Sequence, residues 1–259
     1  MDLRVSVIGS GRWGKNLVSK FHSLGVLHLV YGHRNRDMLR QQCNARFSED
    51  IDRIIKESDA VVVAAPPAAH YELSRKVLEA GRDLFVEKPV TLSVDDAITL
   101  ARLADERERV MLVGHILCYG PGFDALSSLP GEPIGGEACF LKTSTPEKLL
   151  NAYWNFGVHM IALGAALGVP AGRMRVKADD KADVNRRTFT LRTRESSGRE
   201  HELTWDFLDP KNQTDILMME CQHFLDCIRS RERPRTDGWH AVEVMKRLVD
   251  ISPDYRKEG

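Results

Sequence analysis

A glycine-rich turn near the start of the chain, Gly9-Ser10-Gly11-Arg12-Trp13-Gly14, has a spacing suited to binding a phosphate group. It follows a strand-like run over residues 3–8 and precedes a helix-length amphipathic segment. In a GxGxxG turn the first glycine permits a tight bend, the second lets the backbone approach a pyrophosphate, and the third lets helix and strand pack closely. The helix N-terminus adds unpaired N–H groups and the positive end of a dipole. This context favours a dinucleotide-binding site over a purely structural turn.

The end of the next strand-like run is where the adenosine ribose of a bound dinucleotide would lie. Sites that prefer NAD usually carry an acidic residue about 20 residues beyond the glycine-rich turn. This chain instead reads Tyr31-Gly32-His33-Arg34-Asn35-Arg36, and its first carboxylate is Asp37. Arg34 and Arg36 could bind a 2′-phosphate through charge-assisted contacts. The sequence therefore favours NADP over NAD, while Arg34 stacking on adenine or facing solvent stays open as the alternative.

Polar residues also follow two later strand-like runs, over residues 60–64 and 83–86. His70 comes after the first run and its Ala-Pro turn, and Glu87-Lys88-Pro89 follows the second. The carboxyl ends of parallel strands are where open α/β sheets bind ligands. A lysine shielded beside a nicotinamide ring can hold a substrate hydroxyl or take a lowered pKa, and either suits hydride transfer. On spacing alone, however, one lysine before a proline is more often a solvated loop charge.

The elements that must position these residues alternate between short β-branched runs and amphipathic helical segments as far as about residue 118. This alternation indicates βαβ units and a parallel sheet. We therefore expect a doubly wound Rossmann domain over residues 1–118. Strands are predicted over residues 3–8, 27–31, 60–64, 83–86 and 110–113, and helices over 13–24, 51–57, 70–80 and 94–106, the last with Ser93 as its N-cap.

Beyond Tyr119 a Gly/Pro-rich stretch leads into segments that alternate apolar and polar residues with period two. Such alternation predicts strands with one buried face, so a second and different domain begins here. We expect a shortened α/β domain over residues 119–259, with an open and mainly antiparallel sheet. Strands are predicted over 137–143 and 174–178, an antiparallel hairpin over 189–193 and 203–207, and helices over 214–231 and 240–251.

Composition argues against several classes of function. Lys plus Arg number 37 and Asp plus Glu also number 37, so no net charge attracts nucleic acid or an anionic membrane. No apolar stretch reaches the ~20 residues that a membrane helix needs, and no signal segment precedes the first strand. The 5 cysteines lack CxxC spacing, which argues against a disulfide framework and a zinc site. We expect a cytoplasmic protein without a bound metal and with neither nucleic acid nor a membrane as partner.

Taken together, these motifs resemble the glucose–fructose oxidoreductase / inositol dehydrogenase / MocA (Gfo/Idh/MocA) family. The N-terminal half of that family carries the GxGxxG turn, a Pro-rich turn followed by histidine, and the Glu-Lys-Pro motif. The similarity covers nearly the whole chain and is weaker between residues 172 and 210. It also includes Gly114-His115, Pro133-Ile134-Gly135, the Trp154–His159 segment, and the helix over 220–231 with the Pro234–Gly238 segment after it.

The resemblance implies a Rossmann domain joined to an α/β domain whose open sheet forms one wall of the substrate cleft. It also implies that Lys88 is the catalytic lysine and that His159 donates or relays the proton. The chain departs from the family at Asn155, Met160 and Ala162, positions where the family often has an aspartate. An amide at residue 155 can orient His159 but cannot stabilise an imidazolium by charge. Because the family often associates through this sheet, we expect a homodimer or homotetramer.

We therefore expect an NAD- or NADP-dependent oxidoreductase, with NADP favoured, that moves a hydride to or from a ring hydroxyl or ketone of a sugar, nucleotide sugar or cyclitol. The alternative is a dinucleotide-binding sensor or partner subunit with weak or no turnover, which Asn155 and the shortened chain favour. Lys88, His159 and Asn155 are the catalytic candidates, and no metal is required. The predicted cofactor-binding residues are Gly9, Ser10, Gly11, Arg12, Trp13, Gly14, His33, Arg34, Ala65, Pro66, His70, Glu87 and Lys88. The predicted substrate-binding residues are Lys88, His115, Tyr119, Tyr153, Asn155 and His159, although tyrosines such as Tyr119 and Tyr153 are more often amphipathic packing residues.

Overall fold

The computed structural model describes residues 3–143, 152–179, 181–212 and 214–251. The chain packs as two compact units. One contains Met1–Gly114 with Leu217–Val242, and the other contains His115–Ile216 with Glu243–Gly259. The predicted domain boundary at residue 118 remains a prediction, but the helix that follows residue 215 packs with the first unit.

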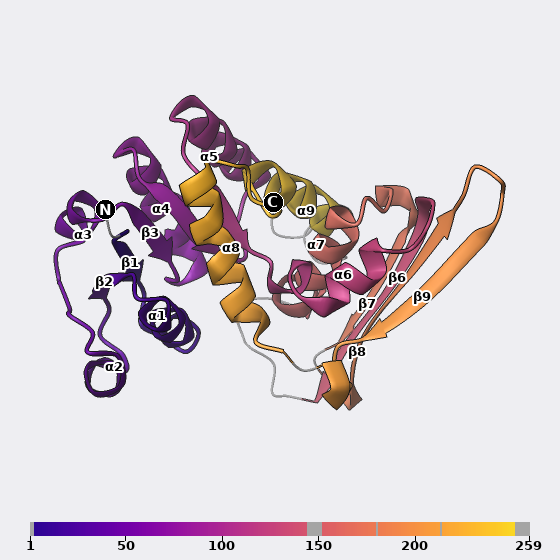
Figure 1. The fold of residues 1–259 in the computed structure, drawn as a ribbon, viewed down its shortest axis with the longest axis horizontal. Coiled ribbons are helices and arrows are strands. Elements are labelled where there is room, and N and C mark those ends of the chain that lie inside the picture. The colour runs from indigo at the N-terminus through magenta and orange to yellow at the C-terminus, as the bar shows by residue number, and fades with distance from the viewer. Residues whose placement is uncertain (1–2, 144–151, 180, 213, 252–259) are drawn as a thin grey trace. The chain divides into compact units, whose positions relative to one another are not determined.

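A five-stranded parallel sheet in the order β2-β1-β3-β4-β5 forms the centre of the first unit (Figure 1). Every residue of β1, β3, β4 and β5 is buried, as expected for a parallel sheet with helices on both faces. Ile8 pairs with Val63 and Val63 with Val86, so these strands end level and their following loops meet at one edge. The predicted strands are confirmed with ends shifted by one or two residues: β1 (Val5–Ile8), β2 (Leu27–Tyr31), β3 (Ala60–Val63), β4 (Asp83–Glu87) and β5 (Met111–Gly114).

The helices of the first unit begin where the sequence offers a cap or a strand ends. The Ser93 side chain accepts a hydrogen bond from the N–H of Asp96, which confirms the predicted N-cap of α5. Asp50 caps α3 in the same way. One helix, α2, was missed by the prediction because its sequence is largely polar and its first turn has no side-chain cap. The bounds are α1 (Gly14–Ser23), α2 (Arg36–Cys43), α3 (Ile51–Glu57), α4 (His70–Glu79), α5 (Val94–Glu106) and α8 (Ile216–Ser230), followed by α9 (Gly238–Ile251).

Helix α8 packs beside α1 on one face of this sheet, while α4 and α5 lie against each other on the other face (Figure 1). Phe224 of α8 meets Phe85 of β4 edge to face at 5.7 Å between ring centroids, and Phe21 of α1 at 6.4 Å. At the end of α8, Arg231 forms a 2.8 Å ion pair with the buried carboxylate of Asp83 at the start of β4. These contacts join α8 to a strand more than a hundred residues earlier in the chain.

A four-stranded mixed sheet in the order β7-β6-β8-β9 forms the second unit. The predicted hairpin is confirmed, because β8 and β9 pair antiparallel with Phe189 opposite Trp205. β6 pairs antiparallel with β8 and parallel with β7, so the sheet is mainly antiparallel, as predicted. Helix α7 packs on β6 and β7, and α6 on β9. The bounds are α6 (Pro121–Ser127), β6 (Glu132–Thr143), α7 (Val158–Ala166), β7 (Met174–Asp179), β8 (Lys181–Arg194) and β9 (Glu200–Asp206).

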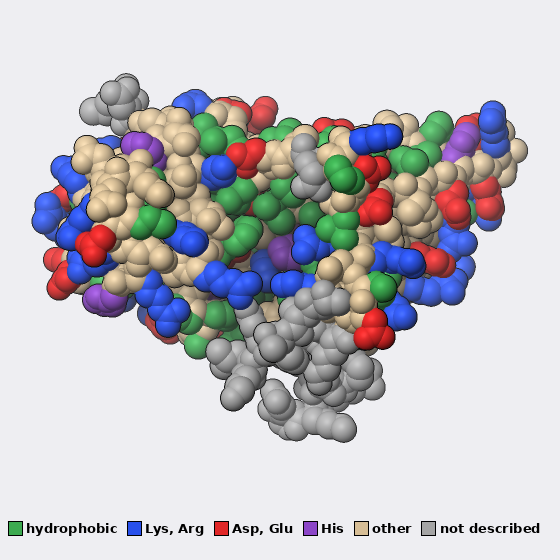
Figure 2. Space-filling model, turned by 90° about the horizontal axis from the view of Figure 1, so that it is seen from below, with side chains coloured by type: hydrophobic (Ala, Val, Ile, Leu, Met, Phe, Trp, Pro, Cys, Tyr) green, Lys and Arg blue, Asp and Glu red, His purple; other side chains and the backbone are tan. Residues whose placement is uncertain are grey.

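Charged side chains of both signs lie side by side over this second sheet (Figure 2). Arg192 contacts Glu137 at 3.3 Å, and Arg194 pairs with Glu200 across the hairpin. Such exposed pairs each contribute little stability. Within the described ranges, no helix is both long and apolar enough to cross a membrane.

Candidate active site

A hollow of about 840 Å³ lies at the carboxyl edge of the first unit's sheet. It is bordered by the turn between β1 and α1, the end of β2, the loop after β3 and one side of α4. This edge is where an open α/β sheet binds a ligand. The predicted cofactor-binding residues that line it are Gly9, Ser10, Gly11, Arg12, Trp13, His33, Arg34, Ala65 and Pro66.

The three positions of the turn that carry glycine differ in whether the fold itself has room for a side chain. Gly9 has a φ of +117°, and a Cβ there would collide with the carbonyl oxygen of Ala64. A Cβ on Gly14 would collide with the carbonyl oxygen of Gly9. A Cβ on Gly11, in contrast, would meet no protein atom within 4 Å. The first and third glycines are therefore required by the fold, whereas the space beside Gly11 fits the close approach of a ligand such as a pyrophosphate.

The position directly after β2 has no room for an acidic side chain. Gly32 stands directly after β2 with a φ of +154°, and a Cβ there would collide with the Ser10 hydroxyl. That hydroxyl donates a 2.5 Å hydrogen bond to the carbonyl oxygen of Arg34, and the side chain of Asn35 donates to the carbonyl oxygen of Ser10 at 2.8 Å. These bonds fix the backbone of the segment that carries His33 and Arg34 against the glycine-rich turn.

One wall of the hollow was missed by the sequence reasoning. Glu72, Leu73 and Lys76 of α4 line it together with Ala68 and Ala69 just before the helix. Their spacing places them on one face of a helix, and this face could have been found by continuing the period from the Pro-rich turn. Lys76 brings a third cation to the hollow, besides Arg12 and Arg34, and lies 3.7 Å from Asp52 on α3.

His70 supports the hollow without lining it. Its ring nitrogens lie 2.7 Å from the carbonyl oxygen of Pro89 and 2.8 Å from that of Ala65. The side chain is buried, and burial lowers the pKa of the imidazole although both carbonyls oppose this effect. His70 therefore ties the loop after β3 to the Glu-Lys-Pro turn, while a contact of His70 with the cofactor remains a prediction.

The Glu-Lys-Pro motif is connected to the hollow through an indole. Trp13, which lines the hollow, donates a hydrogen bond from Nε1 to Oε1 of Glu87. The other carboxyl oxygen, Oε2, accepts the backbone N–H of Lys88 at 3.2 Å. Glu87 is 8% exposed, and burial raises its pKa to about 7, although the charge of Lys88 and the Trp13 hydrogen bond act in the opposite direction. Glu87 and Lys88 themselves lie outside the residues that line the hollow.

The remaining substrate-binding candidates belong to the second unit. His115 and Tyr119 are both buried and flank a short 3₁₀ turn, Ile116–Cys118. Helix α7 packs against this turn. The structure therefore brings the segment of His115 and Tyr119 next to the helix that carries His159.

Helix α7 is preceded by a π-helical turn, Tyr153–Gly157, which continues directly into it. Asn155 is buried in this turn, and His159 is half-buried in the first turn of α7. π-helical turns occur frequently at functional sites. Asn155 and His159 are about one turn apart along one continuous helix, and their joint action with Lys88 of the first unit remains a prediction.

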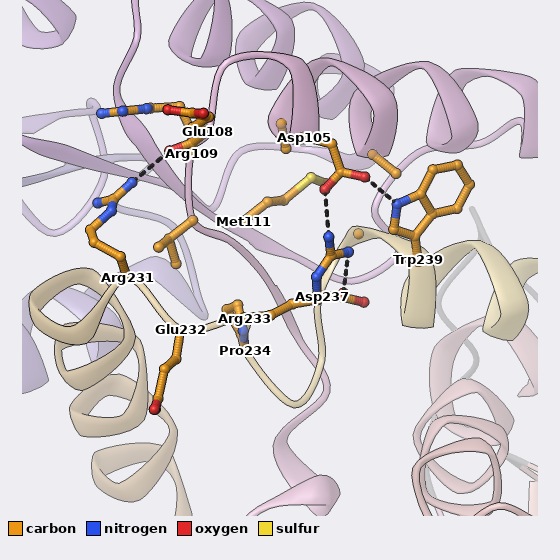
Figure 3. Close-up of a pocket in the computed structure, with 14 residues that line it drawn as sticks. Asp105, Glu108, Arg109, Met111, Arg231, Glu232, Arg233, Pro234, Asp237 and Trp239 are labelled. Carbon is orange, nitrogen blue, oxygen red and sulfur yellow. Dashed lines mark hydrogen bonds and ion pairs between the residues drawn. The ribbon is translucent and has the colours of Figure 1, made fainter.

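A second hollow of about 620 Å³ lies at the opposite, amino edge of the first unit's sheet (Figure 3). Asp105 accepts hydrogen bonds from Arg233 at 2.9 Å and from the Trp239 indole at 2.7 Å, and Arg233 also pairs with Asp237. These groups compensate one another and hold the segment between α8 and α9 against α5. The hollow at the carboxyl edge, where a bare backbone meets a helix N-terminus, is therefore the candidate active site.

Residues 3–115 match the profile of the GFO_IDH_MocA family, described as "Oxidoreductase family, NAD-binding Rossmann fold". The chain is 28% identical over 200 residues to the UDP-N-acetylglucosamine 3-dehydrogenase of Acidithiobacillus ferrooxidans, an alignment that covers 74% of this chain and 64% of that protein. The chain thus spans just under two thirds of the length of this curated relative.

Solved structures share the fold at lower identity. The same A. ferrooxidans enzyme superposes with a TM-score of 0.82 at 20% identity, covering 97% of both chains. GenD2 from gentamicin A biosynthesis, in complex with NAD, gives a TM-score of 0.81 at 19% identity, covering 99% of this chain and 95% of its own. KijD10, a 3-ketoreductase from Actinomadura kijaniata in complex with NADP, gives 0.77 at 14% identity and covers 97% of both chains.

The A. ferrooxidans relative is a dehydrogenase and KijD10 a reductase, so neither supports the alternative of a sensor without turnover. The Rossmann sheet, the mixed second sheet and the motifs over residues 9–14 and 87–89 agree with the profile match and the shared fold. Residues 3–115 therefore match the Gfo/Idh/MocA family of oxidoreductases with an NAD-binding Rossmann fold.

Proposed function

We propose that this protein is an NAD(P)-dependent dehydrogenase or reductase that transfers a hydride to or from a ring hydroxyl or ketone of a sugar-like molecule. The observation that carries the proposal is the open space beside Gly11. That position has no structural need for glycine, yet it lies over a helix N-terminus in a hollow large enough for a dinucleotide.

The residues that would hold the cofactor are those of the hollow. The backbone of residues 9–14 would bind the pyrophosphate, and the segment of His33 and Arg34 would bind the adenosine ribose. When bound, the nicotinamide supplies or accepts the hydride. We propose a preference for NADP, because residues 31–36 contain no carboxylate that could bind the ribose, while Arg12, Arg34 and Lys76 bring three cations to the hollow.

Three side chains would act on the substrate. Lys88 holds the reacting oxygen as a positively charged hydrogen-bond donor. His159 takes the hydroxyl proton during oxidation and returns it during reduction. Asn155, about one turn before His159, orients the imidazole by a hydrogen bond. His115, Tyr119 and Tyr153 would contact other parts of the substrate.

The substrate class follows from the family and the named relatives. The A. ferrooxidans relative acts on UDP-N-acetylglucosamine, and a further relative, 28% identical over 143 residues, is a scyllo-inositol 2-dehydrogenase of Bacillus subtilis. We therefore propose a sugar, nucleotide sugar or cyclitol as the substrate. Association of two or four copies through the second sheet and a cytoplasmic location remain predictions, of which light scattering of the purified protein tests the first.

The cofactor site is tested by placing side chains on the middle glycine. Gly11→Val should abolish binding of NADPH and NADH, measured by calorimetry, while the unfolding midpoint stays at the wild-type value. Gly172→Val is the matched control, because a Cβ there also meets no atom within 4 Å, in the second unit and outside the hollow. Unchanged affinity in Gly11→Val, or an equal loss in Gly172→Val, would show that the site is wrongly assigned.

A further inference from the structure

Helix α8 carries one carboxyl group on its buried face. Glu220 is 1% exposed and is followed on this face by Cys221, Phe224 and Leu225, which are also buried. Its Oε1 atom has no hydrogen-bond partner among the residues that the structure describes. Burying a carboxylate without compensation costs several kcal/mol. The residue therefore needs either a proton or a partner.

The packing of α8 on β4 shows where this carboxyl lies. Arg231 pairs with Asp83 at the start of the strand, and Phe224 packs on Phe85 two residues further along it. The helix and the strand therefore run in opposite directions. Four residues of helix rise about 6 Å, and two residues of strand rise about 6.6 Å. Glu220 stands four residues before Phe224 on α8, and Glu87 stands two residues after Phe85 on β4. The same packing therefore brings Glu220 towards Glu87.

The surroundings of Glu87 leave one side for such a partner. Trp13 of α1 donates to Oε1, and the Lys88 N–H donates to Oε2. Gly114 of β5 lies beside the Glu87 carboxyl group, because a Cβ on this glycine would come within 3.2 Å of it. The charge of Lys88 acts on this carboxyl, and the charge of this carboxyl acts on Glu220. Among the described residues, α1 presents an indole to it and β5 a glycine.

Both carboxyls hold a proton more strongly than an exposed glutamate does. Burial raises the pKa of Glu87 to about 7. Burial first, and then the negative charge of Glu87, raises the pKa of Glu220 well above its ordinary value. An ionised Glu87 therefore favours the protonated form of Glu220.

We propose that Glu220 is a positioning residue which, as a protonated carboxyl on α8, donates its O–H to Glu87 and so holds the carboxylate that fixes Trp13 and the backbone of Lys88. The inference rests on the proposed function, in which Lys88 acts on the reacting oxygen. A protonated carboxyl can supply a buried carboxylate with a donor without adding a second charge. It also explains why an acid stands in the apolar face of α8.

The pair is tested by carbon-13 NMR of the apoprotein labelled at the glutamate δ-carbons, with Glu87→Gln and Glu220→Gln identifying the two signals. The Glu220 signal should stay that of a protonated acid through neutral pH, and the Glu87 signal should titrate near 7. Glu220→Gln should leave the Glu87 midpoint in place, because an amide also donates. Glu220→Met, with no donor, should raise that midpoint by about one pH unit. Glu106→Gln, which removes an exposed acid at the end of α5, is the control.

An ionised Glu220 at neutral pH, or a Glu87 midpoint that moves equally in the Gln and Met variants, would overturn the proposal. If Glu220→Met does not fold, the wild-type and Glu220→Gln titrations decide alone, since a Glu87 midpoint shifted by Gln refutes the donor role. Turnover separates this inference from the function on which it rests. The acid limb of the kcat profile should follow the Glu87 midpoint in each variant. If the acid limb of the kcat profile stays fixed while the NMR midpoint of Glu87 moves, the Glu87–Glu220 pair is retained, but the catalytic role proposed for the Lys88 segment is refuted.

Discussion

Replacing Glu87 with glutamine should remove a large part of the pH dependence of folding stability. The carboxyl is buried, and its pKa is about 7 in the folded protein, against an ordinary value of 4.5. Because the folded pKa is raised, the folded state binds the proton more tightly than the unfolded chain. The stability contributed by this group is complete below pH 4.5 and is lost as the pH rises towards 7.

The size of the effect follows from the shift. A difference of roughly 2.5 pKa units corresponds to about 3.4 kcal/mol in total, of which about 2.5 kcal/mol is lost between about pH 5 and about pH 8. Urea unfolding of the apoprotein at these pH values measures it. Glu87→Gln mimics the protonated acid, so the variant should gain about 2.5 kcal/mol relative to wild type over this range.

Glu106→Gln serves as the control, because Glu106 is exposed and its replacement should leave the pH dependence unchanged. Parallel stability curves for wild type and Glu87→Gln would refute the reasoning, since the carboxyl would then titrate alike in the folded and unfolded states. A variant that becomes less stable relative to wild type as the pH rises would contradict the sign of the shift.

Further measurements address the cofactor, the chemistry and the packing of α8. NADPH should bind more tightly than NADH, and Arg34→Ala should reduce this preference by about tenfold. The control Arg40→Ala, on the exposed side of α2, should leave the preference unchanged. A wild-type protein that binds NADH more tightly contradicts the role given to Arg34. Lys88→Ala should remove most turnover while leaving cofactor affinity within about twofold, and a loss of affinity equal to the loss of turnover would argue against a role at the reacting oxygen. Asn155→Asp should raise turnover or shift its pH optimum upward, because a carboxylate stabilises the imidazolium of His159; an unchanged profile excludes this relay. Arg231→Ala should destabilise the protein by about 2 kcal/mol, because it removes the cation that pairs with the buried Asp83 carboxylate and leaves it the Val110 N–H, whereas the exposed Arg229→Ala should change stability by less than about 0.5 kcal/mol.

Local patterns were sufficient to predict most of the first unit. Buried β-branched runs such as Ala60–Val63 and a capping serine at position 93 act within a few residues, so the sequence displays them directly. Helix α2 was missed because only Leu39 and Cys43 of its eight residues are buried, which is too few to produce an apolar period.

Long-range packing was not predictable in the same way. The apolar stripe of α8 predicts a helix but does not indicate which sheet it covers. Its attachment depends on Arg231 meeting Asp83 and Phe224 meeting Phe85, contacts that join distant parts of the sequence. Glu220 shows what this means for a single residue. In the sequence it only interrupts the apolar stripe of α8, whereas in the structure it is buried and is affected by the charge of Glu87.

The candidate cofactor site was predictable to the level of its motif. GxGxxG identifies the turn, but it cannot separate the two glycines that the fold requires from Gly11, whose side-chain space is empty of protein atoms. The wall formed by Glu72 and Lys76 was missed because neither residue belongs to a recognised motif, although the helical period after the Pro-rich turn places both on one face.

The close contact between Gly32 and Ser10 constrains how the cofactor preference of this protein can change during evolution or in the laboratory. An acidic residue at the end of β2 is the simplest single step towards NAD, but here its Cβ would overlap the Ser10 hydroxyl and its backbone would keep a φ of +154°. The two positions are therefore epistatic, and Ser10 must become smaller before an acid at position 32 can be tolerated. Because the same hydroxyl also anchors the carbonyl of Arg34, that first step loosens the segment it prepares. A route to an acid at position 32 thus passes through an intermediate in which the segment of His33 and Arg34 is held less firmly against the glycine-rich turn.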